Sequence, residues 1–152
     1  AKLGGKKQVF VYDAAARRSV LVSGKLGVPG AGDSDQPALS ADGTKLAFRS
    51  EADLLKGGEH GSWKRQIYLY DAAAGGALSL ISKTAAGEPA HGGSYTPSIN
   101  EDGSVIAFVS EAENLPWPLS NAAQAQVKLA KGRRLRVWLS KENRLLAVGG
   151  RR

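Results

Sequence analysis

The chain has 152 residues, no cysteine and a formal net charge of +7. Its length suits one domain or part of one, and the lack of cysteine excludes disulfide bonds and thiolate metal sites. No apolar run approaches the roughly 20 residues that a membrane-spanning helix needs. The basic residues form short clusters, such as residues 131–136, without the aromatic platform that binds single-stranded nucleic acid. We therefore expect neither a membrane span nor nucleic-acid binding.

The first predicted element is a β-hairpin. The segments Gln8–Tyr12 and Ser19–Ser23 are rich in β-branched and aromatic residues, which are typical of strands, and residues 13–18 join them as a turn. Residues 24–35 are rich in glycine, proline and aspartate, so this segment is predicted to be a loop.

A unit of four strands follows. Residues 36–40 and 45–50 are predicted strands joined by residues 41–44, where an Asp-Gly pair supplies the positive φ angles of a tight primed hairpin turn. Residues 51–65 form a long polar loop. The unit closes with strands at residues 66–70 and 77–82, joined by a turn at residues 71–76.

The same order of elements recurs in the last third of the chain. Strands at residues 95–99 and 104–110 flank a second Asp-Gly turn, and strands at 135–139 and 144–148 close the unit. The loop between its second and third strands is expected to be 10 residues longer, since Tyr68 and Trp138 are 70 positions apart rather than 60. Within that loop, we expect a short helix at Asn121–Lys131, capped by Ser120 and ended by Gly132.

Short motifs repeat at a fixed spacing between the units. Three of them recur 60 positions later: Pro37 as Pro97, Phe48 as Phe108, and Ser50-Glu51-Ala52 as Ser110-Glu111-Ala112. A repeat of four antiparallel strands joined by hairpins predicts an all-β fold of β-propeller blades. We expect a half blade with its loop at residues 1–35, a full blade at 36–94 and a full blade with a long insertion at 95–152. Because a closed ring takes roughly 4 to 8 blades, the ring is incomplete.

The pattern Pro-x-x-Ser-x-Asp-Gly-x-x-x-Ala-Phe-x-Ser, followed by an Ile-Tyr-x-Tyr-Asp strand, resembles the TolB-type β-propeller repeat. The first full unit carries it through Pro37, Ser40, Asp42, Gly43, Ala47, Phe48 and Ser50. The second carries it through Pro97, Asp102, Gly103, Ala107, Phe108 and Ser110, with Asn100 in place of the first serine. The end of the chain departs from the pattern, because Ser140 stands where Tyr70 stood. The resemblance implies a propeller in the periplasm or outside the cell.

Strand direction sorts the connections onto two ends of the blades. The short-turn face holds the tight turns, at residues 41–44, 71–76, 100–103 and 140–143. The long-loop face holds the long connections, at residues 24–35, 51–65, 83–94 and 111–134. Because function on a rigid scaffold usually lies in its loops, the long-loop face is the predicted binding surface.

Six residues of the long-loop face are candidates for binding: Trp63, Trp117, His60, His91, Asp33 and Asp35. The tryptophans either anchor a partner, as tryptophan does at interface centres, or fold back over the blade edge. The histidines lack the third ligand of a metal site, which favours exposed loop positions. Asp33 and Asp35 lack the further oxygens of a calcium loop, which favours capping and turn formation. We expect no metal and no cofactor.

The sequence offers no catalytic set of residues. Both histidines sit in glycine-rich loops without a recognisable serine motif, and no phosphate-binding glycine loop joins a strand to a helix. We therefore expect a non-catalytic propeller scaffold for protein–protein interaction. The alternatives are a propeller that binds glycans or small ligands, and the propeller domain of a peptidase whose catalytic domain is not in this sequence.

The strand order also predicts how the chain assembles. Gln8 opens on what would be the third strand of a blade, which leaves that strand with an unpaired inner edge. Unpaired edges invite pairing with other chains. We expect the partners to be another protein or the remaining blades of a larger propeller, with several copies completing a ring as the alternative.

Overall fold

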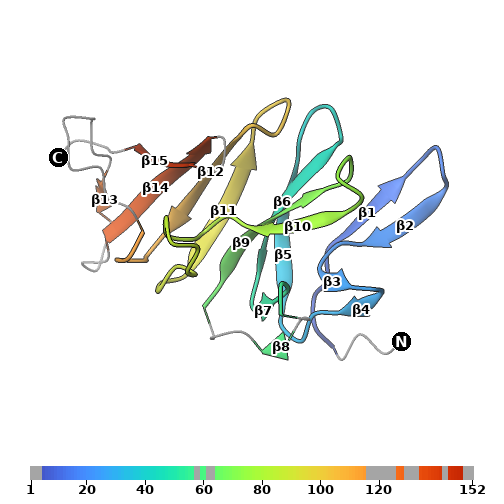
Figure 1. Ribbon diagram of the computed structural model, residues 1–152, viewed down its shortest axis with the longest axis horizontal. Helices are drawn as coiled ribbons and strands as arrows, with labels where there is room; N and C mark the ends of the chain where they lie inside the picture. The colour runs from blue at the N-terminus through green and yellow to red at the C-terminus, as the bar shows by residue number, and fades with distance from the viewer. Residues whose placement is uncertain are drawn as a thin grey trace.

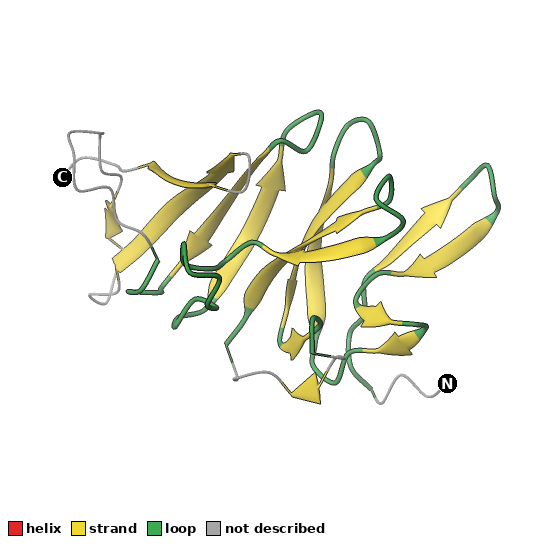
Figure 2. Ribbon diagram, in the orientation of Figure 1, coloured by secondary structure: helices red, strands yellow, loops and turns green. Residues whose placement is uncertain are grey.

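The computed structural model describes residues 5–56, 59–60, 64–115, 126–128, 134–141 and 144–148. Every regular element in these ranges is a β-strand, as Figure 2 shows, so the all-β prediction is confirmed. No helix among the described residues is long and apolar enough to cross a membrane. The strands form three main antiparallel sheets that stand side by side in chain order (Figure 1).

The three sheets are a half blade, a middle blade and a third blade. The half blade pairs β1 (Phe10–Asp13) with β2 (Arg18–Leu21). The middle blade has the order β10 (Ala77–Leu80), β9 (Gln66–Asp71), β6 (Lys45–Ser50) and β5 (Ser34–Leu39). In the third blade, β11 (Ser94–Ile99), β12 (Val105–Ser110) and β14 (Arg134–Lys141) lie in sequence, and β15 (Arg144–Val148) and β13 (Gln126–Lys128) both pair with β14.

The strand registers repeat from the middle blade to the third blade. Phe48 pairs with Tyr68 between β6 and β9, and Phe108 pairs with Trp138 between β12 and β14. These pairs are 60 positions apart in the second strand and 70 in the third. The second and third strands are therefore 10 residues further apart along the chain in the third blade than in the middle blade.

Two predictions of local structure are wrong. Gln126–Lys128 forms strand β13 on β14, which contradicts the helix expected at residues 121–131; the remainder of that segment lies outside the described residues. The predicted loops hold short hairpins, of β3 (Gly24–Lys25) with β4 (Val28–Pro29) and of β7 (Ala52–Asp53) with β8 (Glu59–His60). In each case, pairing with a distant or neighbouring strand overrides the local propensity of the segment.

The Asp-Gly turns close hairpins, but they are not of the predicted primed type. In the turn at residues 41–44, Gly43 has a φ of 72° and Asp42 is not in the positive region, whereas a type I′ turn needs two successive positive φ angles. The Asp42 carboxylate instead accepts hydrogen bonds from the Ser40 hydroxyl (2.6 Å) and the Thr44 N–H (3.0 Å). These bonds, the one from Ser40 foremost, lower the pKa of Asp42.

Asn100 fills the role of Ser40 in the third blade. Its amide donates to Asp102 at 2.8 Å, and its Oδ1 accepts the Val105 N–H at 2.8 Å. The Ser40 hydroxyl makes the matching bonds to Asp42 and from the Lys45 N–H. The replacement of the first serine by asparagine in the third blade therefore keeps both hydrogen bonds.

The middle blade is packed on both faces, because successive residues of a strand point to opposite sides. The face toward the half blade buries Leu46, Phe48 and Tyr68 against Val9 and Val22. The face toward the third blade buries Ala47, Ile67 and Ile81 against Ile106 and Phe108. Each full blade thus turns its large aromatic residue of the second strand toward the preceding sheet.

The outer face of the half blade is an exposed apolar surface. Phe10 and Tyr12 stand 58 positions before Tyr68 and Tyr70 and occupy the matching places in their strand. Tyr68 is 3% exposed, whereas Phe10 and Tyr12 are 48% and 64% exposed. In this structure the half blade therefore presents to solvent the kind of face that the middle blade buries.

A buried hydrogen-bond network joins the third and fourth strands and recurs in two blades. The Ser82 hydroxyl donates to Gln66 Oε1 and accepts the Ile67 N–H at 2.9 Å, and Gln66 Nε2 donates to the Ala90 carbonyl at 2.8 Å. The half blade makes the same bonds through Gln8, Val9, Ser23 and Gly30. The network ties each blade to the segment that leads into the next one.

Tyr68 predicts a loss of stability at alkaline pH. Its burial, and next the nearby Asp53 carboxylate, raise the pKa of Tyr68 from 10.0 to about 12. Between these values the unfolded chain releases a proton that the folded chain keeps, so stability present below pH 10 falls as the pH rises toward 12. Tyr68→Phe should remove roughly 3 kcal/mol of this fall, since one pKa unit corresponds to about 1.4 kcal/mol.

Urea unfolding of wild type and Tyr68→Phe between pH 9 and pH 12 measures this difference, because the lysines common to both chains cancel. Tyr12→Phe is the matched control: Tyr12 is 64% exposed, and its removal should leave the pH dependence unchanged. If the free energy of unfolding falls equally with pH in wild type and Tyr68→Phe, the Tyr68 phenol does not titrate as described.

Candidate functional site

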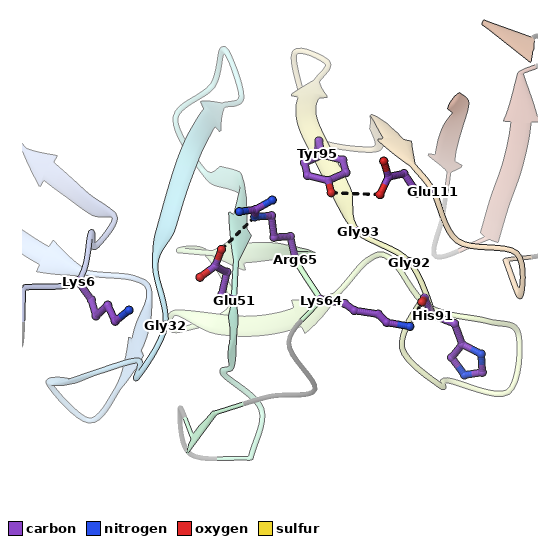
Figure 3. A pocket seen from close by; sticks show the side chains of 10 residues that line it. All are labelled: Lys6, Gly32, Glu51, Lys64, Arg65, His91, Gly92, Gly93, Tyr95 and Glu111. Carbon is purple, nitrogen blue, oxygen red and sulfur yellow. Dashed lines mark hydrogen bonds and ion pairs between the residues drawn. The ribbon is translucent and has the colours of Figure 1, made fainter. Parts of the chain in front are cut away.

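A pocket of about 600 Å³ lies at the long-loop end of the blades, between the middle and third blades. Its lining residues lie beside the starts of β5, β9 and β11 and beside the ends of β6 and β12. These strand ends fix the positions of the lining residues. Figure 1 shows the β5–β6 and β11–β12 turns at the opposite end of these strands. Figure 3 shows the side chains of this inter-blade pocket, among them Lys6, Glu51, Lys64, Arg65, Tyr95 and Glu111.

The repeated Ser-Glu-Ala motif places a glutamate in the pocket from each full blade. The Ser50 hydroxyl accepts the Ala52 N–H at 3.0 Å, and both residues are buried. The Ser110 hydroxyl and the Ala112 N–H make the same bond at 3.1 Å. With its two neighbours held inward, the glutamate between them, Glu51 or Glu111, lies at the pocket wall.

Arg65 joins the two blades across the pocket. Its Nε donates to Glu51 Oε1 at 2.9 Å, and its guanidinium lies 5.9 Å from the centre of the Tyr95 ring. The hydrogen bond to Glu51, and next the one to Tyr95, raise the pKa of Arg65, so the guanidinium stays charged. Because Arg65 and Glu51 are both partly exposed, we assign this pair a positioning role rather than a large share of stability.

Two guanidinium groups, those of Arg49 and Arg65, lie close to the Tyr95 ring. Arg49 lies 5.8 Å from the ring centre and also forms a two-pronged ion pair with Asp35, at 2.7 and 2.5 Å. The Tyr95 hydroxyl is 3.3 Å from Glu111 Oε2, to which it donates. The Tyr95 hydroxyl packs closely on Gly93, since a Cβ atom there would lie 2.2 Å from the hydroxyl oxygen and displace the phenol.

Two lysines and a histidine complete the charged wall. Lys64 Nζ donates to the His91 carbonyl, and the His91 N–H in turn donates to Asn114 Oδ1 at 2.7 Å. Lys6 is exposed beside Gly32, as Figure 3 shows. With Lys6, Lys64 and Arg65 positive, Glu51 and Glu111 negative and His91 neutral, the described part of the lining carries a formal charge of +1. Within the described ranges, no group of three His, Asp or Glu residues could hold a metal ion.

Comparisons with known proteins concern the fold. No protein-family model matches the sequence, and no curated protein matches it. The structure of a protein assigned as TolB from Agrobacterium tumefaciens matches 92% of this chain and 40% of that chain, with a TM-score of 0.51 and 17% sequence identity. TolB from Acinetobacter baumannii matches 93% of this chain and 37% of that chain, with a TM-score of 0.42 and 11% identity. The chain folds as part of a TolB-type β-propeller.

The TolB-type fold confirms the family resemblance seen in the repeat motifs at the level of architecture. The chain spans about 40% of the length of the TolB chain from A. tumefaciens. In such a propeller the blades surround a central channel, and the inter-blade pocket opens where two consecutive blades meet at their long-loop end.

The structure describes four of the six predicted site residues. His91 lines the inter-blade pocket, and His60 lies in β8, where its side chain is outside the described residues. Asp33 accepts the Lys7 N–H at 3.0 Å, and Asp35 holds Arg49, so both carboxylates have partners within the chain. Trp63 and Trp117 lie outside the described residues. Their part in binding remains a prediction.

Sequence reasoning missed most of the pocket. It treated Glu51 and Glu111 only as part of a repeat, and it did not single out Lys64, Arg65 or Tyr95. A signal was present, since a basic pair precedes the third strand in both places, as Lys6-Lys7 and 58 positions later as Lys64-Arg65. What the sequence did not show was that Arg65 of one blade would meet Tyr95 of the next.

Proposed function

We propose that the chain is part of a non-catalytic β-propeller scaffold that binds another protein through its long-loop face. The inter-blade pocket carries this proposal, because several strand ends hold charged groups from consecutive blades around one cavity. Its volume falls within the range of about 300–1,000 Å³ that is usual for small-molecule pockets, and a space of this size also admits side chains of a partner protein. Rigid strand ends position such groups more reliably than free loops do.

The exposed face of the half blade supports the further proposal that the scaffold is part of a larger propeller. Phe10 and Tyr12 are exposed at places where the middle blade is packed. A sheet with this face suits a neighbouring blade, from the same polypeptide, another protein or another copy. We also propose a location in the periplasm or outside the cell, which the likeness of the fold to TolB supports.

The tryptophans of the long-loop face give the test of binding. Immobilised wild type and Trp63→Ala/Trp117→Ala are compared for retained proteins from an envelope extract. We expect retention to fall at least tenfold, since a buried interface tryptophan often contributes 2 kcal/mol or more. Glu101→Ala is the control, because this exposed residue lies in the β11–β12 turn on the short-turn face.

Equal retention by wild type and the tryptophan variant, or a matching loss in Glu101→Ala, would show that the long-loop face is not the binding surface. Glycan-array binding that depends on the same tryptophans would favour the alternative of a glycan-binding propeller.

A further inference from the structure

Arg65 has a carboxylate partner in the inter-blade pocket, whereas Lys6 and Lys64 have none among the described residues. Arg65 is bonded to the Glu51 carboxylate and lies against Tyr95. Lys64 donates to the His91 carbonyl, which is a neutral acceptor, and an ammonium group has three donors. Lys6 has no hydrogen bond or ion pair to any other described residue. Lys64 and Lys6 therefore keep positive charge and free donors for a ligand.

Resting on the proposed function, we propose that the inter-blade pocket binds a carboxylate-bearing peptide segment of the partner protein between Lys6 and Lys64. The two lysines occupy matching places before β1 and β9 and line one pocket. In Figure 3, Lys6 stands on the Gly32 side, whereas Lys64 reaches toward His91. A carboxylate that enters the pocket replaces its bonds to water by hydrogen bonds from the lysine ammonium groups. Such charge-assisted hydrogen bonds are stronger than hydrogen bonds between neutral groups.

The two glutamates of the pocket determine which anion fits. Glu51 forms an ion pair with Arg65, and Glu111 accepts a hydrogen bond from the Tyr95 hydroxyl. Two carboxylates therefore line the wall beside the lysines. A phosphate group carries up to two negative charges, and like charges within a few ångströms repel. A peptide carries single, separated carboxylates, and its backbone N–H groups are donors that carboxylates accept. The mixed lining therefore suits an acidic peptide better than a phosphate compound.

The glycines of the pocket let its wall pack closely on the strand ends. Gly32, Gly92 and Gly93 line the pocket without side chains. Packing requires Gly92, because a Cβ atom there would lie 2.4 Å from the Ala112 backbone nitrogen. A Cβ atom on Gly32 would likewise lie 2.8 Å from the Ala52 backbone nitrogen, so these glycines fix the pocket wall against the strand ends.

Selection of random nine-residue peptides on the full chain tests the proposal. We expect enrichment of Asp or Glu, and we expect a fluorescein-labelled enriched peptide to bind Lys6→Gln/Lys64→Gln at least about tenfold more weakly than wild type, with weaker binding at high salt. The control Arg18→Gln/Lys25→Gln removes two exposed charges outside the pocket and should bind as wild type does. Near-ultraviolet circular dichroism checks that each variant remains folded.

Three outcomes overturn the proposal. They are peptides without acidic residues, equal binding by Lys6→Gln/Lys64→Gln and wild type, and displacement of the peptide by inorganic phosphate at low millimolar concentration. A partner whose retention depends on Trp63 and Trp117 but not on the two lysines would leave the proposed function standing while refuting the acidic-peptide site.

Discussion

Phe48→Ala is expected to lower the free energy of unfolding by about 3–5 kcal/mol, the usual cost of truncating a buried phenylalanine. Phe48 is fully buried, and its ring stacks on Tyr68 with a centroid distance of 6.0 Å and an interplanar angle of 27°. It packs in the cluster that also holds Val9 and Val22 of the half-blade segment. Its removal therefore leaves a cavity at the junction of two blades.

Urea unfolding followed by tryptophan fluorescence and far-ultraviolet circular dichroism measures this loss. Phe10→Ala is the matched control, because it makes the same change on the exposed face of the half blade, and it should cost less than about 1 kcal/mol. A loss in Phe48→Ala no greater than that in Phe10→Ala would mean that the half blade does not pack on the middle blade as described.

Ser82→Ala should lower the free energy of unfolding by about 2–4 kcal/mol, although it removes only one oxygen atom. The Ser82 hydroxyl is fully buried, accepts the Ile67 N–H at 2.9 Å and donates to Gln66 Oε1. Alanine leaves both groups without this partner in the interior, and each such unsatisfied group costs about 1–3 kcal/mol. The cost comes from desolvated groups rather than from lost apolar contact.

Ser79→Ala provides the comparison three residues earlier, since Ser79 of β10 is exposed and its replacement should change stability by less than about 0.5 kcal/mol. Comparable midpoints for Ser82→Ala and wild type would argue that water or another donor serves Ile67 and Gln66. The matching change in the half blade, Ser23→Ala, removes the corresponding bonds to Val9 and Gln8.

The repeated pattern of strands and turns allowed the fold to be predicted from the sequence. Strands appear wherever β-branched and aromatic residues alternate, and the recurrence of Phe48 as Phe108 fixed which strands correspond. The register confirms this, because Phe48 and Phe108 pair with residues at matching places in the third strand. Periodicity of this kind is a property of the chain itself, so it needs no knowledge of tertiary contacts.

The errors arose where a distant partner decides the local structure. Residues 126–128 have helix-forming composition, yet they pair with β14 beside β15. The Asp-Gly turns have the composition of a primed turn, but the Ser40 and Thr44 bonds to Asp42 favour a turn in which Gly43 alone supplies the positive φ. Side-chain hydrogen bonding of this kind is not visible in a dipeptide motif.

The candidate site was predicted only in outline. The expectation that the long-loop face would matter rested on loop length, whereas the pocket is made by residues directly beside strand ends, such as Glu51, Arg65 and Tyr95. Their meeting depends on the packing of one blade on the next, which spacing alone does not reveal. The basic pair before the third strand was the one usable signal.

Hydrogen–deuterium exchange of the chain with and without a bound enriched peptide tests most directly whether the long-loop face is the binding surface. We expect slower exchange in the backbone amides around Glu51, in residues 64–66 and in residues 91–95, where the inter-blade pocket lies. The turns at residues 41–44 and 100–103 should be unchanged. Slower exchange confined to those turns, with none at the pocket, would show that the peptide binds at the short-turn face.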